Sequence, residues 1–121
     1  MTSYGQFCPV AKASELLGER WMLLILRELL LGTRRYSEFQ RALSRISPSL
    51  LTKRLKQLES AGIIVRKAQQ GRKGHDCFLT PAGKELAPVV EHLAVWGMRW
   101  ARGQLTDDEL DVEFLMWDIQ R

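Results

Sequence analysis

The stretch ISPSLLTKRLKQLESAGII, residues 46–64, decides the fold of this chain. Its leucines recur with the spacing i, i+4, i+7, which is one face of an α-helix. They are Leu51, Leu55 and Leu58. Ser47 is a favoured helix cap, Pro48 suits the first helical position, and Gly62 suits a left-handed stop. The sequence therefore predicts a helix of about four turns over residues 48–61.

The opposite face of this helix carries small hydroxyls and lysines. At roughly 100° per residue, these side chains point away from the leucines. They are Ser49, Thr52, Lys53 and Lys56. The lysines lie in the N-terminal half, whereas Glu59 and Ser60 close the other end. Because a solvated helix more often mixes both signs along its length, this face is a candidate binding surface, and plain solvation stays an open alternative for this segment taken alone.

The charge distribution indicates a polyanionic partner. The chain has 121 residues, enough for one domain with a modest core. Residues 34–73 hold eleven basic and two acidic side chains, a net charge of +9, and residues 104–121 hold six acids and one arginine, a net charge of −5. A basic middle with an acidic end is typical of a chain that binds nucleic acid through its middle.

Several functional classes find no support in the sequence. The N-terminus lacks a secretory signal, and the most apolar stretch, residues 21–31, contains Arg27 and Glu28 and is too short to span a membrane. Two cysteines and two histidines are too few and too scattered for a four-ligand metal site. There is no glycine-rich phosphate cradle, HExxH motif or nucleophile elbow. We therefore expect a cytoplasmic protein that is not an enzyme and needs no cofactor or metal.

The remaining pattern predicts a mainly α-helical fold with a small β-hairpin. Helices are expected over residues 9–17, 19–31 and 37–43, the last capped by Ser37, with an extended piece over 34–36. Strands are expected over residues 63–69 and 75–80, joined by the turn QGRKG. A long helix should follow from residue 80 to about 102, and a capping box at Thr106 should begin a last helix. We expect one domain over residues 1–104 and a helical extension over 105–121.

The order of these elements is that of a winged helix-turn-helix. A short turn, residues 44–47, joins the third helix to the fourth, which therefore takes the recognition position, and the hairpin that follows is the wing. The leucines would anchor the fourth helix on the core. Its hydroxyl and lysine face would enter a DNA major groove, whose width admits one helix.

Four pieces of the chain resemble the HxlR family of bacterial winged helix-turn-helix regulators. They are CPVAKASELLGERW, LGTRRYSEFQRAL, the stretch quoted above and LTPAGKEL, and the similarity covers residues 7–100. Members of the family are homodimers that bind operator DNA as repressors or activators, and the resemblance implies the same here. It also implies the placement of the binding residues: Ser49, Thr52, Lys53 and Lys56 on the groove, and Arg72 and Lys73 in the wing.

The chemistry of these residue types suits DNA. Lysines reach guanine or phosphate, and hydroxyls bond to base edges or phosphate oxygens. Arginines before the third helix would clamp phosphate, helped by amide donors at the starts of the third and fourth helices. The predicted DNA-binding residues are Arg35, Ser37, Ser47, Ser49, Thr52, Lys53, Lys56, Arg72 and Lys73. For Arg34, Arg41 and Arg66 a solvated surface role stays equally open, and Arg54, beside the leucines, is expected to form an ion pair or a phosphate contact.

Aromatic residues near the C-terminus predict a homodimer. A single chain of this size would hardly bury all of them. They are Trp96, Trp100, Phe114 and Trp117. Two-fold pairing through N- and C-terminal helices would place two recognition helices roughly 34–36 Å apart, one turn of DNA. The ending of the chain resembles the junction at which some family relatives continue into a second domain.

Cys8 is the candidate sensor of an oxidant. It stands at the start of the first expected helix, where a thiol is more readily oxidised. In several HxlR-type regulators a cysteine at this position senses electrophiles or oxidants, and Cys8 matches it. An idle packed thiol is the alternative, whereas Cys77 is expected in the core. A small-molecule effector bound in a pocket lined by Trp21, Met22 and Trp96 stays open, as does a winged-helix module that binds proteins and not specific DNA.

Overall fold

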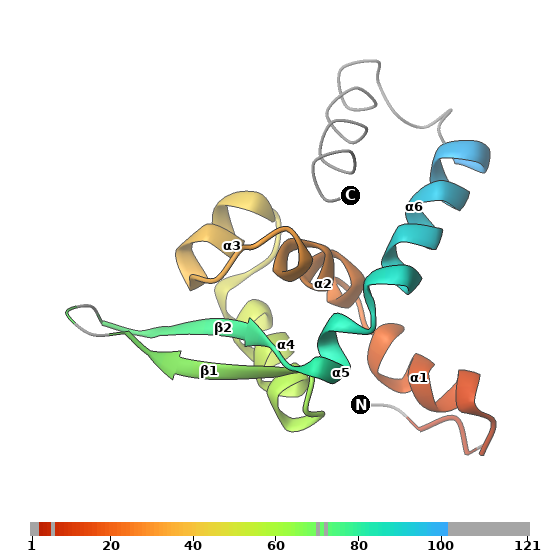
Figure 1. Ribbon diagram of the computed structural model, residues 1–121, viewed down its shortest axis with the longest axis horizontal. Helices are drawn as coiled ribbons and strands as arrows, with labels where there is room; N and C mark the ends of the chain where they lie inside the picture. The colour runs from red at the N-terminus through yellow and green to blue at the C-terminus, as the bar shows by residue number, and fades with distance from the viewer. Residues whose placement is uncertain (1–2, 6, 70, 72, 102–121) are drawn as a thin grey trace. The chain divides into compact units, whose positions relative to one another are not determined.

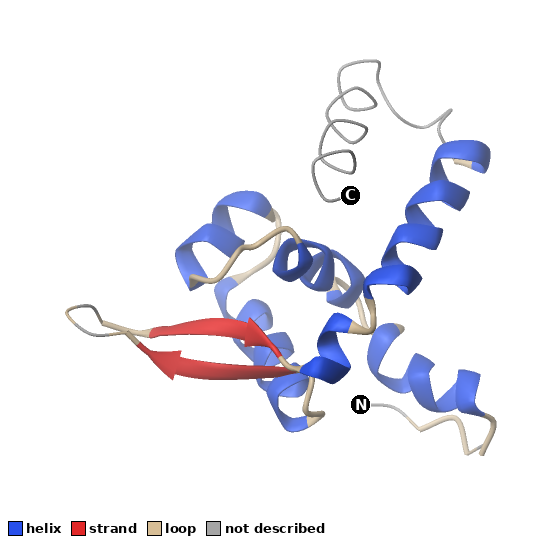
Figure 2. Cartoon of the chain, in the orientation of Figure 1, coloured by secondary structure: helices blue, strands red, loops and turns tan. Residues whose placement is uncertain are grey.

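The fold is mainly α-helical with one two-stranded antiparallel sheet, as the sequence predicts (Figures 1 and 2). A computed structural model describes residues 3–5, 7–69, 71 and 73–101. The elements are α1 (Pro9–Leu17), α2 (Met22–Leu30), α3 (Tyr36–Ala42), α4 (Pro48–Ser60), β1 (Ile64–Ala68), β2 (His75–Leu79), α5 (Pro81–Lys84) and α6 (Ala87–Trp100). The last predicted helix, after Thr106, lies outside the described residues.

The chain divides into two compact units, residues 1–84 and 85–121. The first unit holds α1 to α5 and the hairpin, and its core is built around α2 and α4. The apolar side chains that these two helices bury are Met22, Ile25, Leu26, Leu29, Leu51, Leu55 and Leu58. The predicted leucine face of α4 is therefore confirmed as the face that packs inward. Phe39 of α3 and Leu43, the residue that follows this helix, are buried as well.

The hairpin is the wing of the fold. β1 and β2 pair from Ile64 opposite Leu79 to Ala68 opposite His75. β1 packs against α4, and β2 contacts α2 and α5. Arg35 adds a bridge to Asp76, so the segment before α3 joins the sheet edge as a short extended piece.

A threonine and a glycine form the corner between the wing and α5. The Thr80 hydroxyl donates to the carbonyls of Gly62 and Ile63, at 2.6 and 3.1 Å, and accepts from the amide of Gly83 at 3.2 Å. A Cβ on Gly83 would collide with the Ile63 carbonyl oxygen and would lie 2.8 Å from Leu79 Cδ2. This close approach explains why the sequence Thr-Pro-Ala-Gly follows the second strand.

Two predicted helix starts were wrong. α2 begins at Met22 and not at Glu19, because Trp21 has φ +75° and a left-handed residue cannot lie within a right-handed helix. α3 begins at Tyr36, and its cap position is Arg35, so Ser37 lies inside the first turn and does not cap the helix. The carboxylate of Glu38 takes the capping role by accepting from the amides of Arg35 and Arg34, at 3.0 and 3.3 Å.

The predicted long helix after Thr80 was also wrong, since it is two helices. α5 ends at Lys84, and α6 starts at Ala87 with Pro88 in its first turn. A continuous helix would need a hydrogen bond from residue 88 to the carbonyl of Lys84. Proline has no amide hydrogen, and its ring clashes with that carbonyl.

Among the described residues, no helix is both long enough and apolar enough to cross a membrane.

Candidate nucleic-acid interface

Three hydrogen bonds fix the turn between α3 and α4. The Ser47 side chain accepts from the amide of Leu50 at 3.2 Å, the N-terminal cap that the sequence predicts. The Tyr36 hydroxyl, at the start of α3, donates to the Pro48 carbonyl at 2.9 Å. Gln40 donates to the Ile46 carbonyl at 3.3 Å. The angle between the two helices of the helix-turn-helix is thus held at both ends of the turn.

Arg54 anchors the inner side of α4 to the turn between α1 and α2. Its side chain is buried, and its Nε donates to the Arg20 carbonyl at 2.8 Å. Its other nitrogens reach Gln57 Oε1 at 2.9 Å and the Glu19 carboxylate at 3.5 Å. Of the two roles that the sequence leaves open, ion pair or phosphate contact, the structure gives Arg54 the ion pair.

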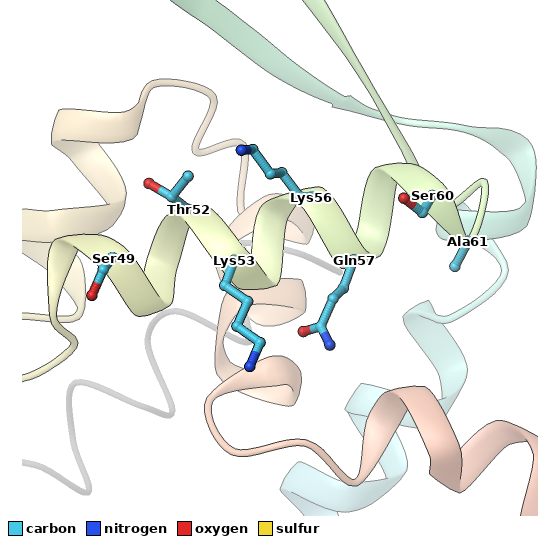
Figure 3. A pocket seen from close by; sticks show the side chains of 7 residues that line it. All are labelled: Ser49, Thr52, Lys53, Lys56, Gln57, Ser60 and Ala61. Atoms are coloured by element: carbon cyan, nitrogen blue, oxygen red, sulfur yellow. The ribbon is translucent and has the colours of Figure 1, made fainter. Parts of the chain in front are cut away.

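The outward face of α4 gathers the four residues predicted to enter the groove. They line an open hollow of about 540 Å³ together with three residues that the sequence reasoning did not single out (Figure 3). The lining side chains described are Ser49, Thr52, Lys53, Lys56, Gln57, Ser60 and Ala61. Gln57 and Ser60 extend the spacing i, i+3, i+4, i+7 by one turn, so the helical period would have found them.

The two lysines of this face are available to a ligand. Lys53 and Lys56 are exposed, and within the part of the chain that the structure describes neither takes part in a hydrogen bond or an ion pair. The hydroxyls are partly engaged. Ser49 Oγ lies 3.4 Å from Ser47 Oγ, and Thr52 Oγ1 donates to the Pro48 carbonyl at 3.0 Å. The face therefore combines two uncompensated positive charges with small side chains that let another surface approach closely.

Several other basic residues are held by partners in the protein. Arg34 donates to the carbonyls of Leu29 and Thr33, both at 3.0 Å. Its guanidinium also lies 5.4 Å from the Phe78 ring centroid. Arg66 pairs with Glu59 at 3.0 Å. These contacts favour structural roles for Arg34, which is half-buried, and for Arg66, which is exposed but paired; Arg35 and Arg41 are exposed.

The N-terminus of α3 is already occupied by a carboxylate. Hydrogen bonds from the amides of Arg35 and Arg34 lower the pKa of Glu38, so this side chain stays ionised and sits where a helix binds an anion. A phosphate at this point would compete with Glu38 for the same amides. The exposed hydroxyl of Ser37 and side chain of Arg35 remain accessible.

The wing contributes Lys73, which is exposed beside Gly74. Arg72, predicted as its partner at the wing tip, lies outside the described residues. Along the strands, Lys67 lies 5.6 Å from the Phe78 ring centroid.

The two cysteines have opposite environments. Cys8 is exposed at the cap position of α1, and Cys77 is buried in β2, as predicted. Burial raises the pKa of the Cys77 thiol, which keeps it protonated and unreactive.

The described residues contain no group of three or more histidine, cysteine, aspartate or glutamate side chains that could hold a metal ion.

One face of α6 is apolar and exposed. Residues at i, i+4, i+7 and i+11 form this stripe, with exposed fractions that rise from 42% to 70% along the helix. They are Val89, Leu93, Trp96 and Trp100. In the first unit, Phe7 and Val10 near the start of α1 are also exposed. Large apolar side chains displayed in this way are typical of surfaces that another protein covers.

Comparisons with known proteins agree with this architecture. A family model described as HxlR-like helix-turn-helix matches residues 16–105. In sequence, the chain is similar to YvaP, an uncharacterised HTH-type transcriptional regulator of Bacillus subtilis strain 168, with 36% identity over 97 residues that cover 78% of this chain and 90% of YvaP. In structure, it is similar to the redox regulator HypR in its reduced form, with a TM-score of 0.70 and 29% identity over 76% of this chain and 92% of HypR. It is also similar to quinone-bound YodB of B. subtilis, with a TM-score of 0.67 and 32% identity over 78% of this chain and all of YodB.

Proposed function

The chain belongs to the HxlR-like helix-turn-helix family of transcriptional regulators, and we propose that it acts by binding specific double-stranded DNA as a homodimer. The relatives named above are regulators, which points to a regulator and not to an enzyme. The observation that carries the proposal is the outward face of α4, where Lys53 and Lys56 stand free of ion pairs among the described residues. A helix of this kind fits a major groove, and its lysines meet base edges or phosphates.

Binding to DNA tests the proposal directly. Protein would be titrated against the DNA upstream of its own gene and against random DNA, at two salt concentrations, by fluorescence anisotropy. We expect tighter binding to one sequence than to random DNA, and a steep loss of affinity with salt. Equal binding to all sequences would favour a module that recognises proteins.

Substitution of the lysines tests the assignment of the face. Lys53→Ala with Lys56→Ala should lower operator affinity and, for each lysine that contacts a phosphate, reduce the slope of log affinity against log salt by about 0.9. The matched control is Lys84→Ala, which removes an exposed lysine from α5. If the double variant binds as tightly as the wild type, α4 does not enter the groove.

The apolar stripe of α6 supports the homodimer. We propose that residues 1–104 contain the DNA-binding domain and its dimerisation surfaces, because Trp96 and Trp100 are 61% and 70% exposed in one chain. Trp96→Gln with Trp100→Gln should raise the dissociation constant of the dimer, measured by sedimentation equilibrium. The control is Glu91→Gln on the same helix. If the double glutamine variant has the same dimer dissociation constant as the wild type, the stripe is not the interface.

We further propose that Cys8 makes the regulator sensitive to oxidants. Its exposure and its place at the start of α1 support this role, as does the likeness to HypR and YodB, which are described as a redox regulator and as quinone-bound. Hydrogen peroxide, which oxidises thiolates to sulfenic acid, should change the DNA affinity of the wild type and of Cys77→Ala but not of Cys8→Ser. An oxidant response that survives in Cys8→Ser would remove Cys8 as the sensor.

A further inference from the structure

Thr52 differs from the other side chains of the α4 face in how its hydroxyl is used. The hydroxyl donates to the Pro48 carbonyl, one turn earlier in the helix, at 3.0 Å. The Tyr36 hydroxyl donates to the same carbonyl at 2.9 Å. The proton of the Thr52 hydroxyl is therefore used in a hydrogen bond within the protein. The Pro48 carbonyl that accepts it also accepts a hydrogen bond from Tyr36 of α3.

This hydrogen bond determines which part of the side chain is presented. A β-branched side chain on a helix has few rotamers, so turning the hydroxyl back to the Pro48 carbonyl also sets the position of the methyl group. In Figure 3 the oxygen of Thr52 lies toward the Ser49 end of α4 and the methyl carbon toward the other end, both on the outer surface of the helix. The methyl group of this half-buried side chain is thus presented on the Lys56 side of α4.

We infer that Thr52 reads the 5-methyl group of a pyrimidine in the major groove through its own methyl group. The inference rests on the DNA-binding function proposed above. Thymine displays its methyl group in the major groove, and an apolar contact from a threonine methyl is one of the ways proteins recognise it. The lysines supply charge and hydrogen bonds, so Thr52 adds the apolar discrimination that they lack. Because 5-methylcytosine carries the same group, the chemistry recognised is the pyrimidine methyl.

The test removes this methyl group from either side of the contact. Duplexes enriched by the full-length protein from a random-sequence library would serve as probes, with each dT replaced in turn by dU. At one position in each half-site, the wild type should bind the dU probe about fourfold more weakly, the effect of one buried methyl group. Thr52→Val, which keeps the methyl and lacks the hydroxyl, should keep this dT-to-dU ratio. Thr52→Ser, which keeps the hydroxyl and lacks the methyl, should reduce the ratio to about one.

The ratio, and not the absolute affinity, decides the question, so a general weakening of a variant does not obscure the answer. Helix content measured by circular dichroism checks that both variants fold, and Lys53→Ala should keep the wild-type ratio. In a second series, each dC would be replaced by 5-methyl-dC. A gain in affinity that the wild type shows and Thr52→Ser lacks would assign the contact to methylated cytosine.

Two results would overturn the inference and leave DNA binding standing. One is a wild type that binds its enriched DNA and is insensitive to every pyrimidine methyl. The other is a dT-to-dU ratio that Thr52→Ser retains and Thr52→Val loses. If no sequence is enriched at all, the proposed function itself is refuted, and the inference with it.

Discussion

Replacing Arg54 by methionine should destabilise the protein without weakening the proposed contact with DNA. Methionine keeps an apolar stem of similar reach and removes the guanidinium that joins α4 to the turn between α1 and α2. The Arg20 carbonyl and the Glu19 carboxylate then lose their partner. Because that turn contains Trp21 at φ +75°, a conformation that costs about 1–2 kcal/mol, the anchor also holds a strained residue in place.

The expected loss of stability is about 2 kcal/mol. Breaking a fully buried charged pair costs about 3–5 kcal/mol, because the remaining partner is left without compensation. Here Arg54 is 7% exposed, whereas the side chain of Glu19 is 25% exposed, so water replaces part of what Glu19 loses. The estimate therefore lies below the fully buried range. At roughly 4 °C for each kcal/mol, the melting temperature should fall by about 8 °C.

Urea unfolding at one fixed protein concentration measures the effect, because the proposed dimerisation would make stability depend on concentration. Lys53→Met, one position earlier on the outer face of α4, is the matched control and should stay within about 0.5 kcal/mol of the wild type. Arg54→Met should also leave the salt dependence of DNA binding unchanged. A loss no larger than that of the control, or a lower salt slope for Arg54→Met, would show that the anchor has been misassigned.

Three further results are expected. Gly83→Ala should cost at least about 2 kcal/mol because the new Cβ meets the Ile63 carbonyl oxygen. Gly62 has φ +78° and open space around it, so Gly62→Ala should cost only the backbone strain, about 1 kcal/mol by urea unfolding. A larger loss of stability for Gly62→Ala than for Gly83→Ala would contradict the packing described. The folded-state pKa of Glu38 is lowered from 4.5, so its contribution to stability is present above that value and is lost as pH falls through the folded pKa. The stability advantage of the wild type over Glu38→Gln should therefore be present at neutral pH and shrink as the pH falls below 4.5. An advantage that grows on acidification would be evidence against this cap.

Local pattern was enough to predict most of the elements. The leucine period, the cap at Ser47 and the stop at Gly62 gave α4 to within a residue, and the change to β-rich sequence gave the hairpin. These signals involve residues only a few positions apart, so they act before any tertiary contact exists. The break before α6 was missed, although Pro88, which cannot continue a helix from α5, is a local signal that could have predicted it.

The caps of α2 and α3 were harder to predict. Nothing in the sequence indicates that Trp21 adopts a left-handed conformation, and a serine at position 37 is a better cap than the arginine at position 35 by propensity alone. The deciding contacts are those of Arg54, 34 residues away from Arg20, and of Glu38 with the amides that precede it.

The sequence by itself determined that this chain forms a winged helix-turn-helix with a basic outer face on α4, because helical period and charge pattern are local properties. The tertiary structure alone decided which charges and hydroxyls on that scaffold are free. Arg54 and Arg66 resemble Lys53 and Lys56 in charge, but folding brings Glu19 and Glu59 against the arginines and, among the described residues, nothing acidic against the lysines. A charge is available to a partner when the fold has not neutralised it, and that depends on residues distant in sequence.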